Sequence, residues 1–370
     1  MIRHSFFYNR KNKHGGFKRT AQISGILQNT IFECQFITDL SYPIAGFSAK
    51  KLVYALNYCR KLQIYNPPGA LLSKIGKDYL QFHSVFSEYG GDRVFIWEGT
   101  RSNCYHLPLF AKEAGFKVIA MPHNLESLVP EQKSFLSGKT APDWLDEELK
   151  ALRICDHVIT ISREEQWLLR LNGISADFLP YYPPPDIVLQ LAKVRERRLL
   201  RDVSIRPKKI LLFGTIGNPP TRIGMVDRIN TINHWWDTTG PEAQIHVAGY
   251  GTGQLHSYVN IPDGVILHGA LGKDRLDDLL VAVDAVIIHQ EATTGCLTKI
   301  PELLLAGVPV LVNADSCRSS ERYSGVHVYE TDEELRELLQ QKLSIPNVYE
   351  KPVRHEARML QTITSMLGKS

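Results

Sequence analysis

The stretch His289–Val312 concentrates residue types that can hold a phosphorylated ligand. In it, a buried apolar run gives way to a loop of small residues and then to a helical pattern. The start of a helix attracts anions through its free N–H groups, and Thr298 and Lys299 add a hydroxyl and a positive charge there. Glu302, in the first helical turn, can accept hydrogen bonds from the two hydroxyls of a ribose. The simpler alternative is that Glu302 only complements the helix dipole.

Loops with glycine after other predicted strands indicate further contacts with a phosphate or a ring. Glycine lets the backbone approach a ligand closely, and a loop that begins a helix also presents N–H groups to an anion. These loops are Gly15-Gly16, the stretch Phe213–Arg222 with Thr215 and Arg222, the pair Gly249 and Gly251, and the turn His268-Gly269. For Gly15-Gly16 the alternative is a simple turn, and for Phe213–Arg222 it is a proline-rich surface loop.

Three polar side chains follow the predicted strand Lys117–Met121, directly after a proline. They are His123, Asn124 and Glu126. A lone histidine is more often structural, but three polar residues at the end of a buried strand are hard to explain as packing. We therefore expect this loop to reach a ligand.

All these loops belong to a chain in which short apolar runs alternate with helical patterns. Strands separated by helices predict βαβ units and parallel sheets. The predicted strands are Ile2–Tyr8, Ile31–Thr38, Arg93–Trp97, Lys117–Met121, His157–Ile161, Lys209–Phe213, Gln244–Ala248, Gly264–His268, Ala285–His289 and Pro309–Asn313. The clearest helices are Phe17–Gln28, Glu164–Asn172, Asp274–Val281, Pro301–Ala306 and Arg354–Leu367.

A proline-rich break divides this pattern in two. Residues 179–185 read LPYYPPP, which can neither continue a helix nor form a central strand. The βα rhythm restarts after a basic helical stretch, and 370 residues exceed what one core normally holds. We expect two doubly wound parallel-sheet domains, 1–205 and 206–351, with the C-terminal helix 352–370 packed back on the first. Ligands of such sheets bind beyond the carboxyl ends of the strands.

The net charge of +4 is unevenly spread along the chain. Residues 1–61 carry ten Lys or Arg against two acidic residues, and residues 193–209 carry eight against two, so the remainder is acidic. Basic surfaces attract anionic lipid headgroups, phosphorylated ligands or nucleic acid, and a solvated surface without a partner is the alternative. No nucleic-acid-binding motif accompanies the charge, so we expect no nucleic-acid partner.

The composition is that of an ordinary globular protein, with 44% hydrophobic and 22% charged residues. No apolar run approaches the roughly 20 residues that span a bilayer, and the first residues lack the apolar segment of a secretory signal. Six cysteines lie far apart without a CxxC pair, which suits neither a zinc module nor a disulfide framework. We therefore expect a cytoplasmic protein, with peripheral contact at the inner face of an anionic membrane as a further hypothesis.

Taken in order, these segments resemble the GT-B glycosyltransferases, in particular the retaining group known as group 1 or family 4. The resemblance extends from about residue 15 to residue 312. Its motifs are HNLE at 123–126, CDHVITISREE at 155–165, LPYYPPP at 179–185, LLFGTIGNPP at 211–220, VAGYGTG at 247–253 and ELLLAGVPV at 302–310. It implies two Rossmann-like domains facing a central cleft, with a nucleotide-sugar donor held mainly by the second.

The resemblance also implies a role for each matching residue. His123, with Asn124 beside it, would contact the transferred sugar near the reacting carbon, and Lys299 and Arg222 would neutralise the diphosphate. The other donor-binding residues would be Gly15 and Gly16 at the diphosphate, Thr215 after the first strand of the second domain, Gly249, Gly251 and His268 around the base, Gly295 and Thr298 beside Lys299, and Glu302 at the ribose.

Two positions depart from the family's pattern. The first of the family's two glutamates falls on Thr294, and Glu291, three residues earlier, would substitute for it if the loop bulges. Thr215 stands where the family has an arginine, and Arg222 only approximates the family's lysine. Glu291 and Thr294 join His123 as candidate catalytic residues. The departures motivate an alternative, a catalytically inactive GT-B-like subunit or a nucleotide-binding partner of another transferase.

The expected reaction is transfer of a hexose from a nucleotide-diphosphate sugar to a saccharide or lipid-linked acceptor, in polysaccharide or glycoconjugate biosynthesis. The chain has no Asp-x-Asp, so we expect no metal and no cofactor, with positive side chains and helix N-termini stabilising the leaving diphosphate. No carboxylate pair of the glycoside hydrolase kind stands out, and retention is implied by the resemblance alone. A sugar-nucleotide epimerase is a third alternative, disfavoured because no suitable pair of glutamate and histidine residues is evident.

Overall fold

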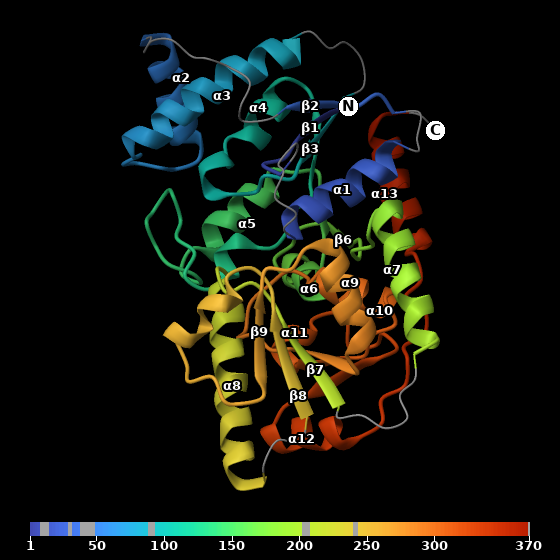
Figure 1. Cartoon of the computed structure of the whole chain (residues 1–370). Coiled ribbons are helices and arrows are strands. Elements are labelled where there is room, and N and C mark those ends of the chain that lie inside the picture. The colour runs from blue at the N-terminus through green and yellow to red at the C-terminus, as the bar shows by residue number, and fades with distance from the viewer. Residues whose placement is uncertain are drawn as a thin grey trace. The chain divides into compact units, whose positions relative to one another are not determined.

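The protein is described by a computed structural model that covers residues 1–7, 15–28, 32–37, 49–87, 93–201, 208–239 and 243–368. The chain divides into two compact α/β units (Figure 1). The first unit comprises Met1–Tyr181, Thr294–Cys296 and Pro352–Ser370, and the second comprises Tyr182–Thr293 and Leu297–Lys351.

Within the described ranges, the first unit is built on a six-stranded parallel sheet with the order β2-β1-β3-β4-β5-β6. The strands are β1 (Ile2–His4), β2 (Gln35–Ile37), β3 (Val94–Trp97), β4 (Lys117–Ala120), β5 (His157–Thr160) and β6 (Ala176–Phe178). The helices are α1 (Gly15–Gln28), α2 (Ala49–Lys61), α3 (Gly69–Ser87), α4 (Leu107–Glu113), α5 (Leu145–Arg153), α6 (Arg163–Leu171) and α13 (Val353–Met366), with short 3-10 helices η1 (Ser102–Cys104) and η2 (Glu126–Leu128).

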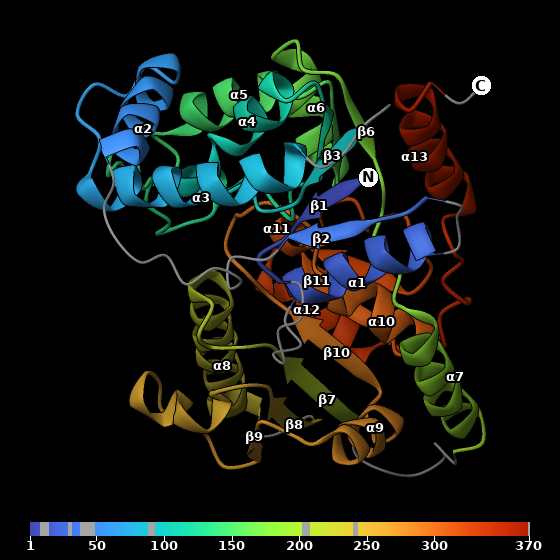
Figure 2. The same ribbon diagram turned by 90° about the horizontal axis from the view of Figure 1, so that it is seen from above.

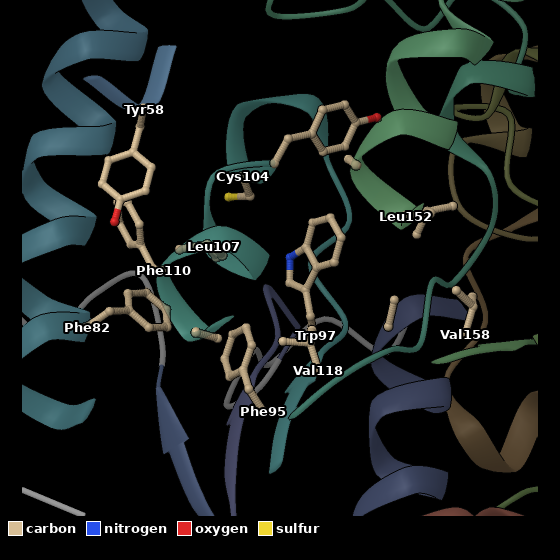
Figure 3. Close-up of a cluster of buried hydrophobic side chains, with 14 of the residues drawn as sticks. Tyr58, Phe82, Phe95, Trp97, Cys104, Leu107, Phe110, Val118, Leu152 and Val158 are labelled. Carbon is tan, nitrogen blue, oxygen red and sulfur yellow. The ribbon is translucent and has the colours of Figure 1, made fainter. Parts of the chain in front are cut away.

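Strand β3 shows how the sheet separates two layers of side chains. All four of its residues are buried, and successive residues of a strand point to opposite faces. Phe95 and Trp97 pack with side chains of α3, α4 and α5, such as Phe110 (Figure 3), and α2 and α3 lie side by side in this layer (Figure 2). Val94 and Ile96 pack on the other face, where α1 and α13 lie side by side (Figure 1). The C-terminal helix therefore belongs to the first unit.

The second unit repeats this plan with a parallel sheet in the order β12-β11-β10-β7-β8-β9. Its strands are β7 (Lys208–Phe213), β8 (Ala243–Ala248), β9 (Val265–Gly269), β10 (Ala285–Ile288), β11 (Val310–Asn313) and β12 (Val326–Tyr329). Its helices are α7 (Pro185–Leu199), α8 (Pro219–Thr239), α9 (Lys273–Ala282), α10 (Lys299–Leu305), α11 (Ala314–Cys317) and α12 (Asp332–Gln340), with the 3-10 helix η3 (Thr252–Ser257).

The predicted architecture of two doubly wound parallel sheets is confirmed, and most predicted strands and helices are present. Strands β6 and β12 and helices α4, α5, α8, α11 and α12 were not predicted. Helix α8 begins at Pro219-Pro220, where prolines fit because the first turn of a helix leaves its N–H groups free. The loop after β7 is therefore shorter than the proline-rich surface loop that was the alternative for Phe213–Arg222. Tyr8, Ile31 and Thr38, at the ends of predicted strands, lie outside the described residues.

The domain boundary lies earlier than predicted, between Tyr181 and Tyr182 rather than at 205/206. Helix α7 was expected in the first domain, but its Leu191 and Val194 pack into a core cluster of the second unit. Pro185 begins this helix instead of only interrupting the chain. Residues 202–207, where the boundary was predicted, lie outside the described part of the chain.

The basic residues of α7 and the segment after it have a structural use inside the second unit. Arg198 donates hydrogen bonds to the carbonyl oxygens of Gly307 at 3.0 Å and Val283 at 2.7 Å, which follow the ends of α10 and α9. Arg201 donates to the Val283 carbonyl and pairs with Asp284 at 2.7 Å. Cations are favourable at helix C-termini, so these arginines bind α7 to its own unit rather than forming a basic face for a partner.

Candidate functional site

The strand order of the second unit reverses between β7 and β10. Strands β8 and β9 continue on one side of β7, while β11 and β12 continue beyond β10. Open α/β sheets bind ligands at such a reversal, outside the carboxyl ends of the strands. The loops that follow Phe213 in β7 and Ile288 in β10 therefore form the candidate site of this unit.

Lys299, the first residue of α10, reaches the carboxyl end of β7. Its ammonium donates a hydrogen bond to the Phe213 carbonyl oxygen at 3.0 Å, and its Nζ lies 3.3 Å from where a side chain on Gly214 would begin. A positive charge therefore stands at the reversal of strand order. Thr298 is buried and does not cap α10, and Glu302 lies in the first turn of that helix, so three predicted donor-binding residues share one short element.

The predicted glycines of the second unit are required by contacts within the protein. A Cβ on Gly249, whose φ is +136°, would lie 1.7 Å from the Gly214 carbonyl oxygen. A Cβ on Gly251 would lie 2.7 Å from the Ile216 side chain. The loops after β7 and β8 thus pack backbone against backbone, whereas the sequence predicted that these glycines make room for a ring or a phosphate.

Gln290 fixes the loop that follows β10, and the sequence analysis did not identify this residue. Asn313 accepts a hydrogen bond from the Gln290 amide N–H at 3.1 Å and donates to the Gln290 carbonyl oxygen at 2.8 Å. The Gln290 side chain donates to the Thr221 hydroxyl in α8 and accepts from Arg318 at 2.7 Å. The available signal was a polar residue next to His289, just past a buried strand.

Three other predicted residues of the second unit have different surroundings. Arg222 lies over the ring of Tyr258, with its Cζ 5.6 Å from the ring centroid. Thr215 is exposed in the loop after β7, and Glu291 is exposed after β10. The structure therefore holds Arg222 on an aromatic face and leaves the other two in solvent.

His268 is engaged with a neighbouring strand. Its Nε2 lies 2.8 Å from Nδ1 of His246 in β8, and the two rings are stacked with centroids 5.1 Å apart. Burial lowers the pKa of both imidazoles, and His268 and Lys209 add to the effect on His246, whose pKa falls to about 4. The pair is therefore neutral at pH 7 and supports the β8–β9 contact.

In the first unit, His123 follows β4 and is almost fully enclosed. Its imidazole stacks on Phe7, with centroids 4.9 Å apart and an interplanar angle of 22°. A Cβ on Gly16 would lie 2.5 Å from the Phe7 ring and 2.8 Å from His123 Nδ1. Gly16 is therefore needed for this packing, while Gly15 is exposed at the start of α1. His14 lies outside the described residues.

A buried ion pair lies beside His123, and the sequence analysis did not identify it. Arg3 in β1 pairs with Glu98, which directly follows β3, and both side chains are fully buried. Glu98 also accepts a hydrogen bond from the Thr20 hydroxyl at 2.8 Å. Burial raises the pKa of Glu98, but Arg3 and the hydrogen bonds from His123 and Arg3 together lower it to about 2. A charged residue at the end of a buried run was the available signal.

Two glutamates hold the turn that follows His123. Glu165 in α6 accepts a hydrogen bond from the Leu125 N–H at 2.8 Å. Glu148 in α5 accepts from the N–H groups of Glu126 at 3.0 Å and Ser127 at 2.9 Å. Burial raises the pKa of Glu148 to about 8, although these hydrogen bonds act in the opposite direction. Buried side chains therefore position the His123 loop from two helices.

Thr294 and Gly295 group with this same loop of the first unit. The Thr294 hydroxyl donates to Glu165 at 2.6 Å and accepts from the Leu125 N–H at 3.2 Å. Gly295 has a φ of +83°, and a Cβ there would lie 3.0 Å from the Asn124 Cβ. His123, Asn124, Thr294 and Gly295 are thus brought together.

Solved structures with the same architecture cover nearly the whole chain. Sucrose-phosphate synthase from Thermosynechococcus elongatus matches with a TM-score of 0.62 and 14% identity, over 100% of this chain and 99% of that one. Anabaena Alr3699/HepE in complex with UDP-glucose matches with a TM-score of 0.58 and 12% identity, over 98% and 99%. WaaG, a glycosyltransferase involved in lipopolysaccharide biosynthesis, matches with a TM-score of 0.54 and 13% identity, over 99% and 96%. The chain has the GT-B fold.

No protein-family model and no curated protein sequence matches this GT-B chain. At identities of 12–14% the structural likeness shows the fold alone. Within that fold, the candidate residues form two groups. The loop of His123 belongs to the first Rossmann-like unit, and Thr298 with the α10 residues Lys299 and Glu302 belongs to the second.

Proposed function

We propose that the protein transfers a sugar from a nucleotide-diphosphate sugar to a saccharide or lipid-linked acceptor. The observation that carries this proposal is the ammonium of Lys299, held at the carboxyl end of β7 where the strand order of a GT-B second unit reverses. A fixed cation there can neutralise charge that develops on a leaving diphosphate. The UDP-glucose complex of the structurally similar HepE supports a donor of this class.

The proposed roles follow the chemistry of each side chain. Lys299 binds the diphosphate, with Arg222 as a second cation after a change of side-chain conformation from Tyr258. Glu302 accepts hydrogen bonds from the ribose hydroxyls. In the first unit, the His123 loop contacts the transferred sugar. Retention of configuration and independence from a metal ion belong to the proposal, and turnover that persists in EDTA would support the latter.

A thermal-shift panel tests donor binding directly. The full chain is titrated with UDP-, GDP-, ADP-, dTDP- and CMP-sugars. A ligand at 100 times its dissociation constant adds about 2.7 kcal/mol of stability, which raises the unfolding temperature measurably. Stabilisation by one nucleotide class is expected, and no stabilisation by any of them at millimolar concentration would refute the proposal.

Lys299→Ala then tests the residue that carries the proposal. We expect turnover of the stabilising donor to fall at least tenfold, because the developing charge loses its partner. Lys273→Ala is the matched control, since Lys273 is the first residue of α9 in the same unit and is exposed. Equal turnover in the two variants would contradict the role of Lys299.

A non-catalytic GT-B subunit is the second candidate, and the position of Thr294 favours it. The hydroxyl that replaces the family's first glutamate is bonded to Glu165 and Leu125 in the first unit. This alternative predicts nucleotide binding without sugar transfer or donor hydrolysis. Mass spectrometry of the donor after incubation with the protein distinguishes the two, because an active enzyme releases free nucleoside diphosphate.

For the acceptor, we propose contact with an anionic membrane surface through α2. Val53 and Leu56 are exposed large apolar residues, 65% and 47% accessible, and Arg60 lies on the same helix face. Such a face binds lipid through apolar burial and attraction to anionic headgroups. No helix in the described ranges is long and apolar enough to cross a bilayer. Leu56→Ser with Arg60→Ser should lower co-sedimentation with anionic vesicles, and unchanged binding would contradict the proposal.

A further inference from the structure

The ring nitrogens of His123 have different surroundings. Nε2 faces the buried polar network, 3.6 Å from Oε2 of Glu98 and 3.4 Å from the hydroxyl oxygen of Thr20. Nδ1 is buried and has no hydrogen-bond partner among the residues that the structure describes. It lies on the side of Gly16, where a side chain would come within 2.8 Å. Nε2 therefore faces polar groups of the protein, and Nδ1 is the ring nitrogen with which a ligand can form a hydrogen bond.

The groups around Nε2 can only accept a hydrogen bond from it. Arg3 holds one oxygen of Glu98, so this carboxylate is ionised and accepts at both oxygens. The Thr20 hydroxyl donates a hydrogen bond to Glu98 at 2.8 Å, so it presents a lone pair to His123. A lone pair on Nε2 would face two further acceptors and be repelled by both. Nε2 must therefore carry a proton.

The imidazole carries one proton and not two at neutral pH. Burial lowers the pKa of His123, with Arg19 and Arg3 acting in the same direction, against the opposing effect of Glu98. A neutral ring with its proton on Nε2 has a lone pair on Nδ1. Nδ1 is then an acceptor, and it suits a ligand group that donates a hydrogen bond.

We propose that Glu98 is a positioning residue that fixes His123 in the Nε2–H tautomer, so that Nδ1 accepts a hydrogen bond from a sugar hydroxyl. A phosphate oxygen would meet a lone pair at Nδ1 and is excluded from this position. The inference rests on the proposed function, because it assigns the ligand of the His123 loop as the hydroxyl-bearing part of the donor or acceptor. Arg3 and Thr20 act through Glu98 by fixing its orientation.

The tautomer is measured by nitrogen NMR on the full chain labelled with ¹⁵N-histidine, where chemical shifts separate protonated from unprotonated ring nitrogens. A His123→Gln variant assigns the His123 signals. We expect a protonated Nε2 and an unprotonated Nδ1 at pH 7 without ligand. The opposite pattern, or rapid exchange between the two tautomers, would overturn the inference.

Glu98→Gln tests whether Glu98 fixes the tautomer of His123. The carboxamide oxygen would face Arg3 and its NH2 group would face His123, so the proton should move to Nδ1. Turnover of the nucleotide sugar found in the thermal-shift panel should fall at least tenfold, because a protonated Nδ1 can no longer accept a hydrogen bond from the sugar hydroxyl. Asp78→Asn is the matched control, since Asp78 forms another buried histidine–carboxylate contact with His106 at 2.7 Å. It should leave the His123 tautomer unchanged, and an unchanged tautomer in Glu98→Gln would overturn the inference.

A second pair of variants covers the case in which Glu98→Gln does not fold. Thr20→Val removes the hydroxyl that orients Glu98, and Thr20→Ser keeps it. We expect Thr20→Val to populate both His123 tautomers and to lose turnover several-fold, while Thr20→Ser restores both readouts. Equal behaviour of the two would contradict the inference. If His123 has the Nε2–H tautomer but the protein binds no sugar nucleotide, the proposed function is refuted and the tautomer assignment stands.

Discussion

The carboxyl edges of the two sheets differ in the groups that make their contacts. In the first unit, side chains meet in a buried network, with Arg3, Glu98, Thr20 and His123 contributed by β1, α1 and the loops after β3 and β4. In the second unit, the loops after β7 and β8 meet through their backbones, and Lys299 brings a positive charge. Fixed side-chain donors and acceptors suit the discrimination of hydroxyls, whereas a fixed positive charge suits a diphosphate.

The largest effect is expected from breaking the side-chain network. Arg3→Met leaves Glu98 buried without its partner, and it also removes hydrogen bonds to Ser24 and the Thr20 carbonyl oxygen, each at 2.8 Å. Loss of one member of a buried ion pair costs about 3–5 kcal/mol, measured as the free energy of unfolding in urea. Lys61→Met is the control, because Lys61 and Glu113 are a half-exposed pair worth about 1 kcal/mol or less. Similar losses in both would refute the special role of the buried pair.

The pH dependence of unfolding sharpens this prediction. The pKa of Glu98 is lowered in the folded protein from 4.5 to about 2. The stability that ionised Glu98 contributes is therefore present above pH 4.5 and is lost as the pH falls towards 2. In Arg3→Met the folded pKa rises, so this acid-dependent loss should shrink. Parallel curves of unfolding free energy for both proteins between about pH 6 and pH 3 would contradict the assignment.

The backbone contact of Gly249 in the second unit predicts that Gly249→Ala loses less unfolding free energy than Arg3→Met. The added Cβ would meet the Gly214 carbonyl oxygen at 1.7 Å, and a φ of +136° strains any residue other than glycine. We expect a loss of about 2–3 kcal/mol in unfolding free energy. Gly253→Ala, where nothing lies within 4 Å of the added carbon, should be close to neutral. A neutral Gly249→Ala would show that these loops separate easily.

The grouping of Lys299 with Glu302 could be predicted from the sequence and the buried network of the first unit could not, because the two depend on different signals. Lys299 and Glu302 lie on one short helix, so local spacing was enough to group them. Arg3, Thr20 and Glu98 come from separate elements, and only the parallel register of β1 with β3 brings them together. Helix α7 was placed in the wrong domain because the groups that Leu191, Val194 and Arg198 contact lie far along the chain, in the second unit.

The smallest effect is expected at the ribose position. Glu302→Ala should weaken donor binding about tenfold, or 1.4 kcal/mol, because two hydroxyl contacts are lost. Glu333→Ala is the control, because Glu333 also lies in the first turn of a helix, α12. If Glu302 served only the helix dipole, Glu302→Ala and Glu333→Ala would lower stability equally and leave titration calorimetry with the donor unchanged.

Hydrogen exchange of the full chain, with and without the donor from the thermal-shift panel, tests the central claim most directly. The account predicts slower exchange in residues 214–218 after β7 and in residues 298–303 at the start of α10, and a loss of this protection in Lys299→Ala. Protection confined to the first unit, with these two segments unchanged at saturating donor, would contradict the assignment of the diphosphate to the second unit.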